Sequence, residues 1–104
     1  MEKITLSDLR DEVKEYNGFC LDLEDALEPT GIHMYYSCIS VYLNSYPCIV
    51  LQNEMGRTAL KHIRSAKKGM TNENDAEYTI RCERYLGNKK SVYIDYKLSC
   101  FNSQ

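Results

Sequence analysis

The residues best suited to binding chemistry in this sequence form a basic segment between positions 57 and 68. Clustered cations with aromatic side chains nearby are typical of surfaces that bind phosphate backbones and stack bases. The chain has nine tyrosines and two phenylalanines available for such stacking. The segment therefore predicts, as one alternative, a small nucleic-acid-binding module. Its cations, which stand beside His62 with no acid among them, are Arg57, Lys61, Arg64, Lys67 and Lys68.

Negative charge gathers at the other end of the chain. Residues 1–28 contain nine acids and three bases, residues 29–53 contain no Asp, Glu, Lys or Arg, and residues 54–104 contain ten bases and six acids. The three net charges are therefore −6, 0 and +4, which sum to the overall −2. Such asymmetry indicates a charged partner, unless the fold brings the two halves together so that they neutralise each other.

Several tyrosines are candidates for a protein-binding surface. Tyr35 and Tyr36 are adjacent on an expected strand and so face opposite sides, while Tyr93 lies on the polar side of the last expected strand. Tyrosine is enriched at protein interfaces because it combines a large apolar area with a polar tip. We combine these tyrosines with the acidic side chains of an expected N-terminal helix as the first predicted site. The site consists of Asp8, Asp11, Glu12, Glu15, Tyr35, Tyr36 and Tyr93.

The sequence offers little for catalysis or for binding a metal or cofactor. None of the five cysteines has C-x-x-C spacing, and the five glycines stand alone, one in each expected turn, which excludes a phosphate-binding glycine loop. An acidic cluster has the oxygen ligands that Mg²⁺ prefers, but a solvated strand face accounts for it more simply. That cluster is Asp22, Glu24, Asp25 and Glu28. We therefore expect no enzymatic activity, no metal and no cofactor.

Length and composition set the class of protein. A chain of 104 residues with 43% hydrophobic and 27% charged residues is typical of one folded domain, so we expect residues 1–104 to form a single domain. This size excludes a doubly wound dinucleotide-binding enzyme. The odd cysteine count and the charged first 15 residues argue against a secreted, disulfide-bonded protein, and the uncharged segment 29–53 is too polar to span a membrane. We expect a cytoplasmic protein with reduced thiols.

One helix is expected, over residues 5–17. Leu6, Leu9, Val13 and Tyr16 recur at the helical period and form one apolar stripe. Thr5 or Ser7 can cap its N-terminus and Gly18 can cap its C-terminus. The acidic residues of the first predicted site then lie on its outer face.

The rest of the chain is expected to be mostly strands. Alternating patterns predict a strand from residue 19 to residue 24 and a C-terminal hairpin with strands over 78–83 and 91–100. Residues 32–43 are expected to form one long strand, bent or bulged, and residues 48–51 a short one. A helical turn near 57–61 is expected to lead into a strand through Lys67. The predicted fold class is α+β, with the helix packed on a five- to six-stranded, mainly antiparallel bent sheet or a partly open small barrel.

The chain resembles the small accessory proteins of phages and mobile elements, of the anti-CRISPR or anti-defence type. The resemblance lies in its short length, the absence of a targeting segment, the strand Tyr78-Thr79-Ile80-Arg81-Cys82 and the closing hairpin. It implies a protein of the host bacterial cytoplasm that inhibits a defence nuclease by occupying its surface, with acidic helix residues imitating a phosphate backbone. The mild net charge of −2 departs from a strong mimic of this kind.

Three functions follow from these observations. The first is a non-enzymatic protein-binding module, such as an inhibitor of a CRISPR or other defence nuclease, acting through the acidic helix and the exposed tyrosines. The second is the nucleic-acid-binding module that uses the basic segment. The third is a structural or assembly protein that forms homo-oligomers through an unpaired edge strand.

Overall fold

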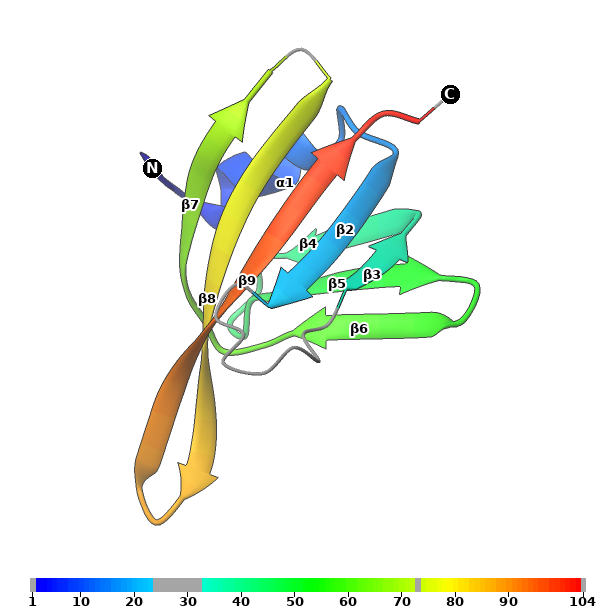
Figure 1. Cartoon of the computed structure of the whole chain (residues 1–104). Coiled ribbons are helices and arrows are strands. Elements are labelled where there is room, and N and C mark those ends of the chain that lie inside the picture. Colours follow the sequence, from blue (N-terminus) through cyan, green and yellow to red (C-terminus); the bar gives the residue numbers. More distant parts are fainter. Residues whose placement is uncertain (1, 24–32, 73, 104) are drawn as a thin grey trace.

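The computed structural model describes residues 2–23, 33–72 and 74–103 (Figure 1). Nine strands and one short helix occur in this part of the chain, so the structure is mostly antiparallel sheet with a small helical part. This agrees in outline with the α+β prediction. In chain order the elements are β1 (Glu2–Ile4), α1 (Leu6–Val13), β2 (Gly18–Leu23), β3 (His33–Tyr36), β4 (Cys38–Tyr42), β5 (Cys48–Asn53), β6 (Gly56–Leu60), β7 (Ile63–Thr71), β8 (Asp75–Gly87) and β9 (Lys90–Phe101).

The strands form two sheets rather than one barrel. The larger sheet has six strands in the order β1-β7-β8-β9-β2-β3, and the smaller one has three in the order β4-β5-β6. Every strand pairing among the described residues is antiparallel. Figure 1 shows the smaller sheet crossing behind the lower part of the larger one, with α1 behind its upper part. The expected five to six strands thus match the larger sheet alone.

The core lies where α1 and the smaller sheet cover one face of the larger sheet. Leu9 and Val13 of α1 are buried, as the apolar stripe predicts. They belong to one cluster with side chains from both sheets. The fully buried members from the strands include Leu21, Ile49, Leu51, Tyr78, Ile80 and Leu98.

Helix α1 is shorter than its apolar pattern predicts. Thr5 caps the N-terminus, since its hydroxyl accepts a hydrogen bond from the Asp8 amide at 3.0 Å, as expected. The helix ends at Val13 with Lys14 as its C-cap, so the predicted extension to residue 17 is wrong. Gly18 therefore starts β2 instead of capping the helix, and its missing Cβ leaves room for the ring of Phe101 on the neighbouring strand.

The predicted long strand over residues 32–43 is also wrong. Ser37 separates β3 from β4, and the two strands belong to different sheets. The Ser37 amide donates to the Gln52 carbonyl at 3.0 Å, which fixes the chain to the smaller sheet as it leaves the larger one. Strand-forming residues on both sides of Ser37 give no sequence signal of this change.

Residues 57–61 form no helical turn, contrary to the prediction. Residues 57–60 belong to β6, which pairs with β5 from Gly56 to Leu60. His62 then adopts a left-handed backbone conformation with φ of 54°, and the chain enters β7 in the larger sheet. The three-residue spacing of Leu60 and Ile63 therefore comes from a sheet-to-sheet crossing, and only resembles a helical period.

The C-terminal hairpin is confirmed, and it is longer than predicted. β8 and β9 pair from Asp75–Phe101 to Gly87–Lys90, while the paired part of β7 reaches only to Cys82. Asn88 and Lys89 both have positive φ, 49° and 58°, as a two-residue turn of type I′ requires. The outer half of the hairpin projects from the body as a two-stranded ribbon (Figure 1). We call residues 84–93 the arm.

Candidate binding surface

The arm is the longest uninterrupted run of exposed positions among the described residues. All ten of its residues are exposed. Four are large apolar or aromatic residues with between 43% and 60% of their surface accessible, although side chains of this type are usually buried. They are Tyr85, Leu86, Val92 and Tyr93.

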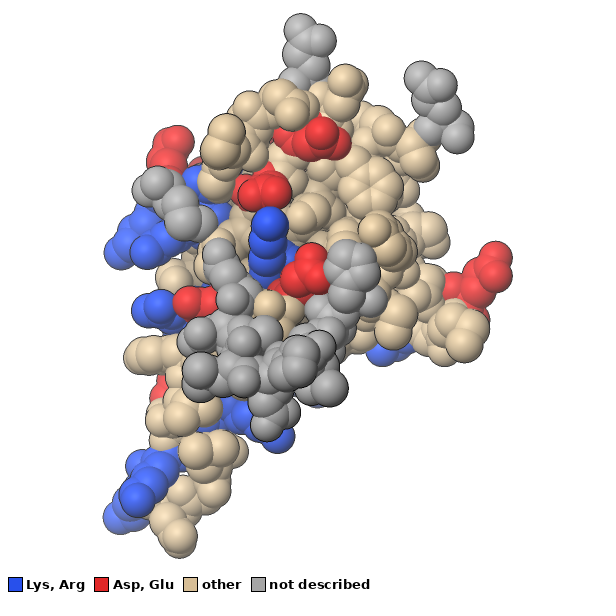
Figure 2. All heavy atoms as spheres, in the orientation of Figure 1, with Lys and Arg blue, Asp and Glu red and all other residues tan. Residues whose placement is uncertain are grey.

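Positive charge accompanies this apolar surface. The arm contains three cations, Arg84, Lys89 and Lys90, and no acid. Figure 2 shows Lys and Arg side chains at its tip, while Asp and Glu lie mainly over the body. Because α1 lies at the other end of the molecule, whose longest dimension is 47 Å, the exposed acids of the helix are far from these cations (Figure 1).

A network of side chains holds the root of the arm in place. Arg64 of β7 donates to Glu83 at 2.7 Å and to the Tyr85 hydroxyl at 2.8 Å. Ser91 donates to the other oxygen of Glu83 at 2.6 Å, and the Tyr85 ring meets the His62 ring edge-on at 5.2 Å. Hydrogen bonds from Ser91 and Arg64 lower the pKa of Glu83, so this carboxylate stays ionised and engaged. These contacts tie the root of the arm to β7 and to His62.

A second set of contacts supports the arm on the outer face of the large sheet. Arg81 forms a two-point ion pair with Asp95, at 2.9 and 3.1 Å, and its guanidinium lies 5.3 Å from the centre of the Tyr93 ring. The hydrogen bonds from Arg81 lower the pKa of Asp95. A cation held over an aromatic face stabilises that ring's position, so Tyr93 is presented to solvent in one orientation.

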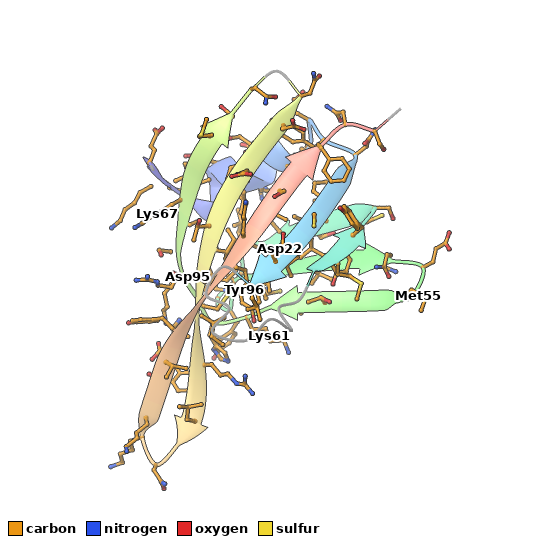
Figure 3. The ribbon with its side chains drawn as sticks, viewed as in Figure 1. Asp22, Met55, Lys61, Lys67, Asp95 and Tyr96 are labelled. Atoms are coloured by element: carbon orange, nitrogen blue, oxygen red, sulfur yellow. The ribbon has the colours of Figure 1, made fainter. Side chains whose placement is uncertain are left out.

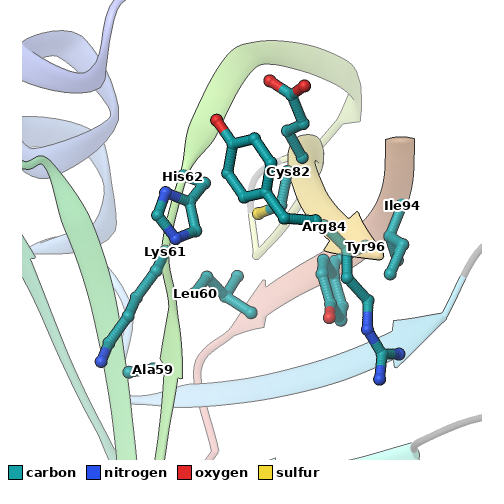
Figure 4. Close-up of a pocket in the computed structure, with 10 residues that line it drawn as sticks. Ala59, Leu60, Lys61, His62, Cys82, Arg84, Ile94 and Tyr96 are labelled. Carbon is teal, nitrogen blue, oxygen red and sulfur yellow. The ribbon is translucent and has the colours of Figure 1, made fainter. Parts of the chain in front are cut away.

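The root of the arm borders a hollow of about 390 Å³. The end of β6, the crossing segment and the root of the hairpin surround it (Figure 4). We call this hollow the root notch. Its floor is apolar, formed mainly by Leu60, Cys82, Ile94 and Tyr96, and its rim carries the cations Lys61 and Arg84.

The predicted basic segment does not form one continuous surface. Arg57 lies next to the β5–β6 turn, Lys61 lies at the sheet crossing, and Lys67 and Lys68 point to opposite faces of β7. Figure 3 shows Lys61 and Lys67 in different parts of the molecule. Lys68 pairs with Glu12 at 2.6 Å and Arg64 with Glu83, so two of the five cations are neutralised.

The acidic helix face is divided in a similar way. Asp8, Asp11 and Glu15 are exposed, as predicted. Glu12 instead faces the large sheet, where it accepts from Lys68 and from the hydroxyl of buried Tyr78 at 2.7 Å. Part of the negative and part of the positive segment therefore neutralise each other inside the fold.

The three predicted tyrosines have different surroundings. Tyr35 and Tyr93 are both 60% exposed, whereas Tyr36 is 5% exposed and its hydroxyl lies 2.6 Å from that of Thr58. The alternation of β3 thus places Tyr36 in the core, between the two sheets. Tyr36 serves packing, which removes it from any partner-binding surface.

Neither a metal-binding cluster nor a membrane-spanning helix is found in residues 2–23, 33–72 and 74–103. The described residues contain no group of three or more histidine, cysteine, aspartate or glutamate side chains that could hold a metal. Of the acidic cluster considered for Mg²⁺, only Asp22 lies in the described part of the chain; Glu24, Asp25 and Glu28 lie outside it. No helix among the described residues is long and apolar enough to cross a membrane.

Comparison with protein-family models, curated proteins and solved structures found no match to this chain. The case for function therefore depends on the arm and its surroundings. Sequence patterns missed the arm, apart from Tyr93, because strand alternation is the same whether or not a hairpin has neighbouring strands. The available signal was the absence of any acid between residues 84 and 93, together with three cations, Arg84, Lys89 and Lys90, around the Gly87-Asn88 pair.

Proposed function

We propose that the protein is a non-enzymatic binding module that binds a protein partner through its arm. The observation behind this proposal is the exposure of four apolar side chains on a projecting hairpin whose root is held by side-chain hydrogen bonds. Aromatic and arginine side chains are the residue types most enriched where binding energy concentrates in protein interfaces. The arm combines both in ten residues.

Energetics support a protein partner. Burying one large apolar side chain contributes about 1.5–3 kcal/mol, so the four on the arm could together contribute several kcal/mol to a complex. The contacts made by Arg64 and Arg81 also fix the root before binding, which reduces the entropy lost on association.

The resemblance to anti-defence proteins makes this proposal more specific. In that version the protein acts in the host bacterial cytoplasm and the arm blocks a working surface of a defence nuclease. The acidic helix contributes less than expected, because Glu12 is neutralised and only Asp8, Asp11 and Glu15 remain exposed to imitate phosphates.

Nucleic acid is a second candidate partner, favoured by the three arm cations. A two-stranded ribbon fits the major groove of DNA, and Arg84, Lys89 and Lys90 would contact phosphates along it. Oligomerisation through an edge strand, the third predicted function, would use β1, β3, β4 or β6, which lie at the edges of the two sheets.

Photo-crosslinking in cells that express the protein tests the proposal. A photoreactive phenylalanine replaces Leu86 in the arm or, as a matched control, Met55, which is 90% exposed at the far β5–β6 turn (Figure 3). We expect a nuclease-resistant protein adduct at position 86 and none at position 55. A nuclease-sensitive adduct would support the nucleic-acid alternative, and equal adducts at both positions would exclude the arm as the contact surface.

A further inference from the structure

We propose that the root notch binds an extended acidic peptide of the protein partner, with an apolar side chain on the floor and carboxylates on the two rim cations. This inference rests on the proposed function, because it names the chemistry of the segment that the partner presents. Three features of the notch support it: its floor, its rim and the strand β6, which pairs with β5 alone among the described residues.

The floor suits an aliphatic or aromatic side chain. Leu60 and Cys82 are 3% and 6% exposed and close the bottom of the hollow, while half-buried Ile94 and Tyr96 form one wall. A volume of about 390 Å³ lies within the ~300–1,000 Å³ of typical binding clefts. A side chain that fills the notch would remove from water the apolar atoms that remain solvent-accessible where the chain crosses between the two sheets.

The two cations on the rim favour a ligand with negative charge. Lys61 and Arg84 extend in the same direction on opposite sides of Leu60 (Figure 4). Neither forms an ion pair with any carboxylate of the described residues. The one acid that lines the notch, Glu83, is already held by Arg64 and Ser91. Two uncompensated cations therefore flank an apolar floor.

The backbone of β6 provides a way to align a peptide. β6 is an edge strand of the smaller sheet, and its last residues, Ala59 and Leu60, line the notch. In an antiparallel ladder, alternate N–H and C=O groups of an edge strand point away from its partner strand. An added strand would satisfy these groups and run into the notch, as in other cases of strand addition.

The same geometry is poor for nucleic acid. Base binding needs an open aromatic face, but the Tyr85 ring meets His62 edge-on and its hydroxyl is held by Arg64. Of the four floor residues only Tyr96 is aromatic, and it is half-buried, while Leu60, Cys82 and Ile94 offer aliphatic carbon and sulfur. The notch thus favours a peptide with carboxylates on either side of an apolar residue.

A titration followed by NMR tests this inference directly. The probe is a synthetic octapeptide in which Asp and Glu alternate with Val and Leu, and its control is the same peptide with Lys at every acidic position. The acidic peptide should shift the amide signals of residues 57–62, 83–85 and 94–96, and added salt should weaken its binding. The lysine peptide should leave these signals unchanged.

Two variants sharpen the test. Replacing both rim cations with acids (Lys61→Glu with Arg84→Glu) should weaken peptide binding on the order of tenfold or more. Ala59→Trp should fill the notch and also abolish the shifts. Lys14→Glu, at an exposed cation on the distant helix, is the matched charge control and should change affinity less than about twofold. Unfolding curves would confirm that each variant folds.

Three experimental results would exclude an acidic-peptide site at the notch. Absence of shifts at millimolar acidic peptide, shifts confined to another surface, or shifts at the notch with single-stranded oligothymidylate instead of the peptide would each exclude an acidic-peptide site. If the crosslink at position 86 persists in those cases, the arm still binds a protein and only the notch inference fails. If that crosslink is absent as well, the proposed function fails too.

Discussion

Lys68 of β7 lies 2.6 Å from Glu12 of helix α1, across the space between the sheet and the helix. The same carboxylate oxygen accepts a hydrogen bond from Tyr78, whose own pKa is raised by burial and by this bond. Two segments that look like separate charged surfaces in the sequence are therefore partly joined inside the fold. This pair fixes the helix to the sheet.

Glu12→Gln should destabilise the protein at neutral pH. Burial raises the pKa of Glu12, but hydrogen bonds from Lys68 and Tyr78 outweigh it, so the pKa lies below its ordinary value of 4.5. The stabilisation is thus fully present above about 4.5 and is lost as pH falls through the lower folded value. We expect a loss of about 1–2 kcal/mol at pH 7, measured by urea unfolding, that disappears in strong acid. Exposed Glu15→Gln is the control, and an equal loss there would contradict this account.

The thiols should differ sharply in reactivity. Burial raises the pKa of Cys20 and Cys82 to about 11 and that of Cys100 to about 12, whereas Cys38 is exposed and Cys48 half-buried. Since the thiolate is the reactive form, a thiol reagent at pH 8 should label Cys38 first and the three buried thiols only after unfolding. Mass spectrometry of the labelled peptides gives the order. Rapid labelling of Cys100 in the native protein would show that this part of the core is open.

Arg64→Met should loosen the arm without unfolding the body. Arg64 is the side chain that ties β7 to Glu83 and Tyr85 on β8. Without it, amide hydrogen exchange should accelerate in residues 83–93 and stay unchanged in the core strands. Lys67→Met, a cation on the same strand, serves as the control. Unchanged exchange in the arm would mean that hairpin pairing alone holds its root.

Gly18→Ala should destabilise the start of β2. An added Cβ would overlap the Phe101 ring, and overpacking of this kind costs about 1–3 kcal/mol. Combining it with Phe101→Ala should cost less than the sum of the two single changes, because the obstructing ring is gone. Thermal unfolding of the four proteins forms the double-mutant cycle, and strict additivity would show that the ring moves aside freely.

Reversing Asp11 and Glu15 to Lys tests the acidic helix as a partner surface. Both side chains are exposed, and surface changes of this kind usually alter stability by less than about 0.5 kcal/mol. If the arm is the contact element, the crosslink at position 86 should persist in this variant. Its loss in a folded variant would return the interface to the helix, as the resemblance to charge-mimicking inhibitors implies.

The sequence predicts the hairpin and the helix start well because both depend on local patterns. Thr5 caps the helix as expected, and the alternation of β8 and β9 follows their apolar residues. The break at Ser37 and the crossing at His62 are not predictable in this way, since each depends on which sheet the following strand joins. The exposure of the arm is equally non-local, because it results from β7 pairing no further than Cys82.

The candidate site, too, is predicted only in part, because it depends on contacts between residues far apart in the sequence. Charge counting identified Lys61, Arg64 and Lys68 as one group, yet only Lys61 keeps an uncompensated charge at the notch. Arg84 was not singled out because the sequence gives no sign that it lies beside residue 61. Tyr93 is exposed, as predicted, since it lies on the polar side of a strand whose alternation is clear.

The strand order also constrains how the chain can be made. The smaller sheet needs only residues 38–60, so it can assemble early during translation. β2, by contrast, lies between β3 and β9, and it pairs with β9 across about 80 residues of sequence, from Gly18 to Phe101. Until β9 leaves the ribosome, one edge of β2 has unpaired backbone N–H and C=O groups. Such high contact order slows folding, so the larger sheet should form last and depend most on protection from aggregation in the cell.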